Sequence, residues 1–331
     1  MGIPERMNDV SAQPLIDWAI AGLAEQGITA DGAPEVRNRD WSIVVRQPTD
    51  RGVVWLKASA RGFAAEAGLL VLLGAAAPEH VLQPLLADPD RGWFVTPDGG
   101  PVLSDSGAAG SGQWISLLTG YADLQRAVAD EVDALRATGL PDMSPATLPA
   151  WWEKVLDRAA EEPDVPLGLA DLDALRGLGG QVAAWAAELD EDITSGRLPL
   201  SVDHNDLHTD NVFVTGGELR IFDWGDAALA HPFTCLGLAL RTATGIEDVP
   251  TGIDDGPLRA AYLQRWAGPD AEVPTWMQRS CLLAEGMSYL SLAASWLRLP
   301  GGFGPEFAGY FASFLTGFRD FAADPQLPTT G

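Results

Sequence analysis

The chain has 331 residues, 47% of them hydrophobic, and can bury a sizeable core in one large or two ordinary domains. Its 46 acidic and 21 basic residues give a formal charge of -25. This charge excludes nucleic acid as a partner, because nucleic acid demands a basic surface. It also disfavours anionic membranes and would attract cationic small molecules.

The cysteine usage and the apolar segments predict a cytoplasmic protein. Cys235 and Cys281 lie in apolar surroundings, which favours reduced core residues and an intracellular compartment. Residues 1–26 contain no long apolar run behind a basic front, so we expect no secretion signal. The most apolar stretch, residues 281–297, is interrupted by Glu285 and is shorter than the roughly 20 residues of a membrane span. We infer no obligate protein partner.

The first hundred residues predict a small antiparallel sheet with helices. Apolar residues at helical spacing indicate a helix over residues 14–26, which Gly27 ends, and a second helix over residues 62–73. Lys57, one of only two lysines, lies in an expected strand, and Glu66 lies in the first turns of the second helix. The expected strands are residues 35–37, 41–46, 53–58, 81–86 and 92–97.

The pattern changes after the sequence Asp98-Gly99-Gly100-Pro101, and the rest of the chain is mainly helical. From residue 112 the apolar residues recur at helical spacing, which is typical of buried helix faces. Further helices are expected to begin near residue 151 and to cover residues 172–189, 234–242 and 281–297. A final helix carries a stripe of phenylalanines from Phe307 to Phe321.

Residues 201–227 contain an expected hairpin with a dense set of polar side chains. Two short apolar runs, residues 212–214 and 219–222, flank the pair Gly216-Gly217, and paired glycines supply the positive φ angles of a tight turn. Cross-strand partners then have numbers that sum to about 433 by this pairing geometry. Asn211 is expected to face Phe222, which places Asp223 one residue away.

Asp206 precedes Asn211 by five residues, so one amide and two carboxylates are expected to converge with Asp223. Amide and carboxylate oxygens are hard ligands suited to magnesium, which fills its other positions with water and phosphate oxygens. A carboxylate that does not bind the metal can accept a proton from an attacking hydroxyl. This division of labour is typical of phosphoryl transfer.

The motif spacing supports that chemistry. Residues 204–211 (HNDLHTDN) fit H-x-D-x-x-x-x-N, and residues 223–225 (DWG) stand where D-F-G would. The chain resembles the aminoglycoside phosphotransferase / choline kinase-like small-molecule kinases, whose loop is typically H-G-D-x-H-x-x-N followed by a D-W motif. The resemblance covers most of the chain, with the strand lysine, helix glutamate, catalytic loop and D-W-G in the family's order.

The resemblance implies a role for each motif residue. Asp206 would be the catalytic base, and Asn211 and Asp223 would be the magnesium ligands. His204 and His208 would support the loop. Lys57 would hold the α- and β-phosphates of ATP, and Glu66 would orient its amine.

The resemblance also locates the expected nucleotide site, with one departure. No glycine lies in residues 38–42 (NRDWS), so the glycine-rich phosphate loop of protein kinases is absent, and we expect phosphate contacts from the backbone near Trp41 and Ser42. The family's interlobe hinge, whose backbone pairs with adenine, is expected at Val95, Thr96, Pro97 and Asp98. A plain surface turn is the alternative for residues 98–100.

The acceptor site is less defined by the sequence. Asp226 and Glu285 are candidate acceptor-binding residues. Glu285 is the only acid in an apolar helix and needs a partner, since burying a lone carboxylate is costly. That partner is either an amino group of the substrate or a nearby arginine such as Arg279 or Arg298.

The sequence thus predicts an α+β, bilobal, protein-kinase-like fold. Residues 1–97 would form the sheet-based N-lobe and residues 98–331 the helical C-lobe. The expected activity is ATP- and Mg2+-dependent phosphorylation of a hydroxyl on an aminoglycoside, amino sugar or other hydroxylated natural product, as in antibiotic resistance or self-resistance. GTP in place of ATP stays open. Two alternatives are a metal-dependent hydrolase that uses His204, Asp206 and His208, and a catalytically silent nucleotide-binding protein.

Overall fold

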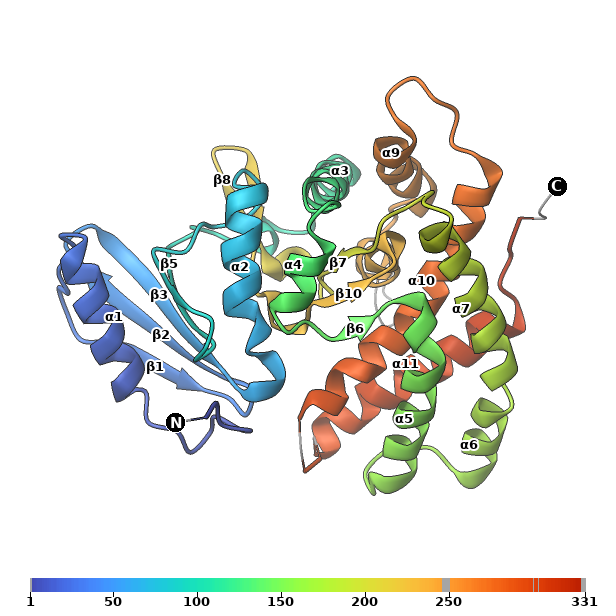
Figure 1. Cartoon of the computed structure of the whole chain (residues 1–331), viewed down its shortest axis with the longest axis horizontal. Helices are drawn as coiled ribbons and strands as arrows, with labels where there is room; N and C mark the ends of the chain where they lie inside the picture. The colour runs from blue at the N-terminus through green and yellow to red at the C-terminus, as the bar shows by residue number, and fades with distance from the viewer. Residues whose placement is uncertain (1, 246–250, 300, 303, 329–331) are drawn as a thin grey trace. The chain divides into compact units, whose positions relative to one another are not determined.

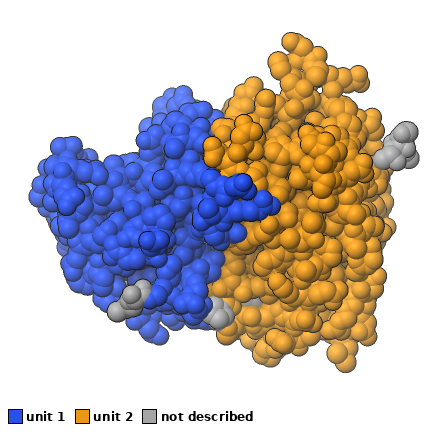
Figure 2. All heavy atoms as spheres, in the orientation of Figure 1, with its two compact units in different colours: residues 1–105, 133–140, 210–226 blue, residues 106–132, 141–209, 227–331 orange. Residues whose placement is uncertain are grey.

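The computed structural model describes residues 2–245, 251–299, 301–302 and 304–328, and it has a mixed α+β architecture (Figure 1). The chain forms two compact units (Figure 2). Unit 1 comprises Met1–Asp105, Asp133–Leu140 and Asp210–Asp226, and unit 2 comprises Ser106–Val132, Pro141–Thr209 and Ala227–Gly331. Two later segments thus join the N-terminal hundred residues in unit 1. The division of the chain into lobes at residue 97 stays a prediction.

Unit 1 is built on a five-stranded antiparallel sheet in the order β1-β2-β3-β5-β4. Side chains alternate across it, so that Ile43 and Val45 of β2 are buried on one face while Val44 between them is only partly covered. Helix α1 (Gln13–Glu25) packs against this sheet and buries Leu15, Ile16, Ala19 and Leu23. The strands are β1 (Glu35–Asn38), β2 (Ser42–Thr49), β3 (Gly52–Ser59), β4 (Leu86–Asp88) and β5 (Trp93–Pro97).

Three further elements complete the part of unit 1 that matters for the site. Helix α2 (Ala65–Ala76) contacts β4 and the short 3-10 turn η5 (Trp224–Asp226). The hairpin of β8 (Val212–Thr215) and β9 (Glu218–Ile221) is attached to the unit through bridges at both of its strands. Helix α4 (Val132–Ala137) belongs almost entirely to this unit.

Of residues 81–86, expected as a strand, Val81 forms an isolated bridge to Ile221 and Leu86 begins β4, while residues 82–85 belong to no strand. Pro84 contributes to the difference, because proline has no N–H to donate to a ladder. The expectation was therefore wrong for most of this segment.

Unit 2 combines a three-stranded sheet, in the order β6-β10-β7, with a large helical body. Its strands are β6 (Asp142–Met143), β7 (Ser201–Asp203) and β10 (Ala228–Ala230). Its helices are α3 (Ser111–Ala127), α5 (Leu148–Glu161), α6 (Leu169–Arg176), α7 (Gly179–Thr194), α8 (Leu236–Thr244), α9 (Asp255–Ala267), α10 (Thr275–Ser295) and α11 (Pro305–Ala323).

Helix α10 is the interior helix of unit 2, as its nearly uniform apolar composition predicts. Neighbouring helices approach α10 so closely that glycine is required at two of the contacts. A Cβ on Gly286 of α10 would lie 2.0 Å from the ring of Phe321 in α11, and one on Gly237 of α8 would lie 1.9 Å from Ser288 Oγ. The single helix expected over residues 172–189 is instead two helices, since α6 ends at Arg176 with Gly177 as its C-cap and α7 begins at Gly179.

No helix in the described part of the chain is both long and apolar enough to cross a membrane.

Candidate functional site

Lys57 is held by a glutamate from a helix of its own unit. The register places Lys57 of β3 opposite Val44 of β2, on the sheet face whose side chains are only partly buried. Its Nζ lies 2.9 Å from Glu66 Oε1 and 2.8 Å from Glu66 Oε2, and Ser59 Oγ donates to Glu66 Oε2 at 3.2 Å. The structure thus makes the strand-lysine to helix-glutamate pair that the sequence predicts.

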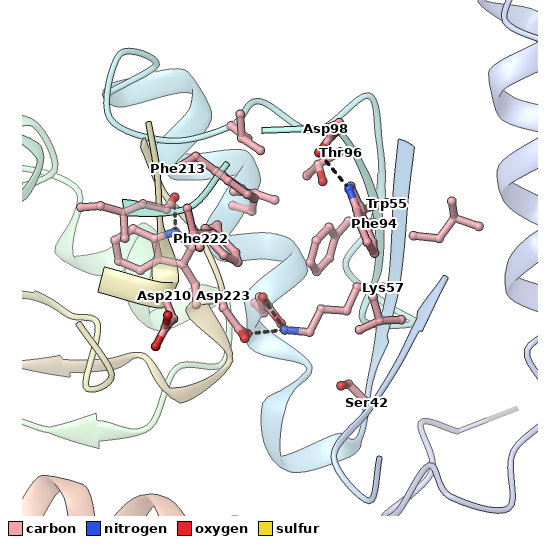
Figure 3. Close-up of a pocket in the computed structure, with 18 of the residues that line it drawn as sticks. Ser42, Trp55, Lys57, Phe94, Thr96, Asp98, Asp210, Phe213, Phe222 and Asp223 are labelled. Carbon is pink, nitrogen blue, oxygen red and sulfur yellow. Dashed lines mark hydrogen bonds and ion pairs between the residues drawn. The ribbon is translucent and has the colours of Figure 1, made fainter. Parts of the chain in front are cut away.

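Asp223 is a second partner of the same lysine. Lys57 Nζ donates to Asp223 Oδ1 at 2.5 Å (Figure 3). Burial alone would lower the pKa of Lys57, but the carboxylates of Asp223 and Glu66 outweigh it and hold that pKa above its ordinary value. Lys57 therefore stays positively charged at neutral pH. The Asp223 side chain is half exposed, at 50%, so one side of this carboxylate faces solvent.

The β8–β9 hairpin has the register that the sequence predicts. Val212 faces Ile221 and Thr215 faces Glu218, while Gly216 and Gly217 form the turn with φ of +63° and +90°. The Phe222 N–H donates to the Asn211 carbonyl at 3.0 Å, which extends the pairing beyond the strands. Asn211 is 6% exposed, and Asp223 follows its partner directly.

The backbone is unusual at Asp223 and Asn205, which both have positive φ (+61° and +59°) without being glycine. Positive φ is uncommon for non-glycine residues and costs free energy, and residues that adopt it cluster at functional sites. Asn205 directly precedes Asp206, so both irregular positions lie within the motif that the sequence singles out.

A cavity of about 660 Å³ opens beside these groups within unit 1. Lys57, Glu66 and Asp223 line it together with aromatic side chains from the sheet and the hairpin. Phe213 stacks on Phe222, with ring centroids 3.9 Å apart and an interplanar angle of 15°. The cavity thus combines a flat aromatic wall with a charged end. Its aromatic lining consists of Trp41, Trp55, Phe94, Phe213, Phe222 and Trp224.

Of the four expected hinge residues, Thr96 and Asp98 line the cavity, and Trp55 Nε1 donates to Asp98 Oδ1 at 3.2 Å (Figure 3). The Asp98 N–H donates to the Val53 carbonyl at 3.1 Å. Val95 is fully buried and its carbonyl accepts from the Leu85 N–H at 2.7 Å, while Pro97 has no N–H to donate. Neither Val95 nor Pro97 is among the lining residues.

The glycine-free segment between β1 and β2 also borders the cavity. Trp41 and Ser42, the expected phosphate-binding positions, both line it. Arg37 and Arg39 line it as well, and the sequence interpretation missed them. Two arginines two positions apart, one in an edge strand and one just after it, were a usable signal in a chain with so few basic residues.

The loop that carries Asp206 belongs to unit 2 and is fixed there by buried hydrogen bonds. The fully buried Tyr121 hydroxyl accepts from the His204 N–H at 2.7 Å and donates to the Val202 carbonyl at 3.0 Å. Asn205 Nδ2 donates to the Ser291 carbonyl of α10 at 3.2 Å. The two bonds anchor both residues that precede Asp206.

The remaining loop residues differ in exposure. The His204 side chain is fully buried, whereas those of His208 and Asp206 are 26% and 40% exposed and lie 3.3 Å apart, from Nε2 to Oδ2. In the described ranges, no group of three or more His, Cys, Asp and Glu side chains is arranged to hold a metal ion.

Asp203, at the end of β7, is a buried carboxyl with a shifted pKa. Burial raises that pKa from 3.8 to about 7, against the Asn205 N–H bond and the charge of Arg298, which lower it. The Asn205 N–H donates to Asp203 Oδ1 at 3.0 Å.

Glu285, a candidate acceptor residue, has an arginine partner other than the two expected. Arg259 of α9 binds it with two hydrogen bonds, of 2.6 Å to Oε1 and 2.9 Å to Oε2. Arg279 instead pairs with Glu188, and Arg298 donates to the Ala227 carbonyl. An arginine partner is thus confirmed, although it is Arg259 and neither of the two named; Arg279 lies six positions before Glu285, on a different face of α10. Asp226, the other candidate, ends the turn η5.

A family model described as the phosphotransferase enzyme family matches residues 33–277, well over half of the chain. The chain belongs to this phosphotransferase family. The match spans the lysine, the glutamate and the whole motif region. It favours a small-molecule kinase over the hydrolase alternative. A search of the curated proteins finds no match.

Solved structures show that the fold is that of the phosphotransferase family. The ethanolamine kinase of Plasmodium vivax is 10% identical, with a TM-score of 0.61 over 97% of this chain and 86% of that one. A choline/ethanolamine kinase family protein of Mesorhizobium loti is 16% identical, with a TM-score of 0.56 over 92% and 99%. A spectinomycin phosphotransferase bound to ADP and spectinomycin is 11% identical, with a TM-score of 0.52 over 96% and 99%. The predicted kinase-like fold is thereby confirmed.

Proposed function

We propose that this phosphotransferase moves the γ-phosphoryl group of ATP to a hydroxyl of a small molecule. The observation that carries the proposal is the contact of Lys57 with both Glu66 and Asp223 at the charged end of an aromatic cavity. A lysine held by a helix glutamate is the arrangement that positions the nucleotide phosphates in kinases.

The cavity suits a purine nucleotide. Its volume of about 660 Å³ falls within the usual range for small-molecule sites, and its lining combines aromatic faces with a few polar groups. The base packs among the aromatic side chains, which include the stacked pair of Phe213 and Phe222, on the sheet face that carries Lys57. Lys57 then meets the α- and β-phosphates at the other end.

The hairpin ends fit a divalent cation of the magnesium type. Asn211 and Asp223 offer hard oxygen donors from the two strands of one hairpin, and Mg2+ characteristically takes only one or two protein ligands beside phosphates and water. When bound there, the cation neutralises charge on the β- and γ-phosphates. The half-exposed Asp223 carboxylate is accessible to it.

Asp206 serves as the base in the proposed reaction. The acceptor hydroxyl loses its proton to the Asp206 carboxylate, and its oxygen forms the new bond to the γ-phosphorus. The bond from that phosphorus to the β-phosphate oxygen breaks, so the products are a phosphorylated acceptor and ADP. The His208 ring 3.3 Å from the carboxylate orients it.

The acceptor is proposed to be a hydroxylated and cationic small molecule, such as an aminoglycoside, amino sugar or amino alcohol. The formal charge of -25 favours accumulation of cations near the protein. The named relatives support the same class, since the solved structures include an ethanolamine kinase and a spectinomycin phosphotransferase.

A screen with γ-labelled ATP tests the proposal. The protein is incubated with Mg2+ and a panel of aminoglycosides, amino sugars, nucleoside antibiotics, choline and ethanolamine. We expect label in at least one acceptor, formed only with both Mg2+ and the acceptor. Binding of Mg·ATP without transfer to any acceptor would instead favour the catalytically silent alternative, and turnover without ATP would overturn the proposal.

A further inference from the structure

Arg37 lies on the same row of the sheet as Lys57. The register pairs Arg37 of β1 with Val44 of β2, and Val44 with Lys57 of β3. Side chains of directly paired residues point to the same face, so the arginine and the lysine share the cavity face two strand spacings apart, about 10 Å. All three residues line the cavity, and so does Arg39, two residues further along.

The acidic residues nearest to these arginines in sequence are bound by other arginines. Glu35 of β1 pairs with Arg46 at 3.0 Å, and Asp40, the neighbour of Arg39, pairs with Arg6. Across the part of the chain that the structure describes, no carboxylate lies within ion-pair distance of Arg37 or Arg39. Among the described residues, these two cations thus border the cavity without an ion-pair partner, in a chain where acids outnumber bases by more than two to one.

The acids that line the cavity also have partners of their own. Asp223 and Glu66 bind Lys57. Asp98 accepts from Trp55, Asp105 accepts from the Val102 N–H at 3.0 Å, and Asp210 accepts from the Ser104 hydroxyl. Each lining acid thus has a partner other than Arg37 or Arg39, which leaves the N–H donors of the two guanidinium groups to an anion that enters from outside the chain.

The backbone of the β1–β2 connection does not form a glycine cradle. Residues 38–42 contain no glycine, and none of them has a positive φ. Hydrogen bonds from neighbouring segments fix the connection, since the Met7 N–H donates to the Asp40 carbonyl and the Ala60 N–H to the Trp41 carbonyl, both at 2.8 Å. Loops that wrap phosphates with successive N–H groups use glycines to reach the required conformation.

We propose that Arg37 and Arg39 bind the triphosphate of the nucleotide and replace a glycine-rich loop in this chain. This inference rests on the proposed function. Guanidinium groups form paired, charge-assisted hydrogen bonds with phosphate oxygens. Lys57 and the two arginines then contact the phosphate chain from the same sheet. The phosphates are then bound by charged side chains, where a glycine-rich loop would bind them with backbone N–H groups.

Calorimetric titration of the full chain with ATP (in Mg2+), tripolyphosphate and adenosine tests the inference. The variants are Arg37→Gln and Arg39→Gln, and the matched control is Arg46→Gln, which changes an arginine of the same sheet that Glu35 already neutralises. We expect each cavity variant to raise the Kd for ATP and for tripolyphosphate about tenfold, as the loss of one charge-assisted contact predicts. Adenosine binding should stay unchanged in every variant.

The possible outcomes separate this inference from the proposed function. If the unmodified protein does not bind ATP, the proposed function itself fails. If it binds ATP and both cavity variants bind it equally well, the arginine inference is overturned. Equal weakening of ATP binding and adenosine binding would also overturn it, because the substitutions would then disturb the whole cavity and not the phosphate contacts alone. Arg37→Lys, which keeps the charge but loses the paired donors, should give an intermediate Kd.

Discussion

The Lys57 ammonium and the Asp223 carboxylate lie 2.5 Å apart, although 166 residues separate them in the chain. One residue lies in the central part of the N-terminal sheet and the other directly follows the β8–β9 hairpin. The contact joins the proposed phosphate-binding lysine to a proposed metal ligand. Both functions therefore depend on the same hairpin being folded against the sheet.

Asp223→Asn should weaken metal binding. The neutral amide is a poorer ligand than a carboxylate, and even changes outside the ligand shell commonly cost metal sites tenfold or more in affinity. We expect the Kd for Mn2+, measured by electron paramagnetic resonance with ADP present, to rise at least about tenfold. Asp210→Asn is the control, because Asp210 lies on the same segment but binds the Ser104 hydroxyl. Equal loss in both variants would contradict the assignment of Asp223.

Asp206→Asn should stop proton removal and leave nucleotide binding intact. The amide has nearly the same shape as the carboxylate but cannot accept the proton, and a general base contributes about 10²–10⁴-fold to the rate. We expect kcat with an identified acceptor to fall by that factor while the Kd for ATP is retained. A variant that keeps most of its kcat would remove Asp206 from the mechanism.

Gly99→Ala should disturb the aromatic wall of the cavity. A Cβ at this position would lie 2.2 Å from the Phe213 ring, which is stacked on Phe222. Overpacking of this kind typically costs about 1–3 kcal/mol. We expect a lower melting temperature and weaker adenosine binding. Gly112→Ala serves as control, since its Cβ meets nothing within 4 Å and alanine favours the helix.

The buried Asp203 should make stability depend on pH. Its pKa of about 7 in the folded protein exceeds the ordinary 3.8, so the folded state holds a proton that the unfolded state releases. Its contribution to stability is complete below about pH 4 and is lost as the pH rises through 7, by roughly 1.4 kcal/mol per unit of pKa difference. Asp203→Asn should therefore lose less stability than the unmodified protein between pH 4 and 8, as measured by urea unfolding. Parallel stability profiles would contradict this expectation.

The sequence predicted the fold and the order of its motifs because both depend on short-range patterns. The pair Gly216-Gly217 determines the position of the turn. That position fixes the strand register, which brings Asn211 opposite Phe222. The contact between Lys57 and Glu66 was predictable in the same way, from a strand followed at once by a helix. The prediction was wrong for residues 81–85 because their apolar pattern suggested a strand in spite of the proline among them.

Features that depend on which charged groups meet in three dimensions were not predictable. Nothing in the sequence indicates that Glu35 forms an ion pair with Arg46 rather than with Arg37, or that Asp40 forms one with Arg6. The same is true of Glu285, whose partner Arg259 comes from another helix. The charged residues in a sequence do not by themselves show which ion pairs form. Each acid could meet several different arginines, depending on how the chain folds.

The attachment of Asp40 to Arg6 and to the Met7 N–H has a practical consequence for protein production. Arg61 strengthens the same attachment, since its N–H donates to the Pro4 carbonyl at 2.8 Å. Deletion or replacement of residues 3–7 would remove these contacts from the strand connection that carries Arg39. Samples meant for nucleotide titrations should keep residues 3–7 native and carry any affinity handle elsewhere.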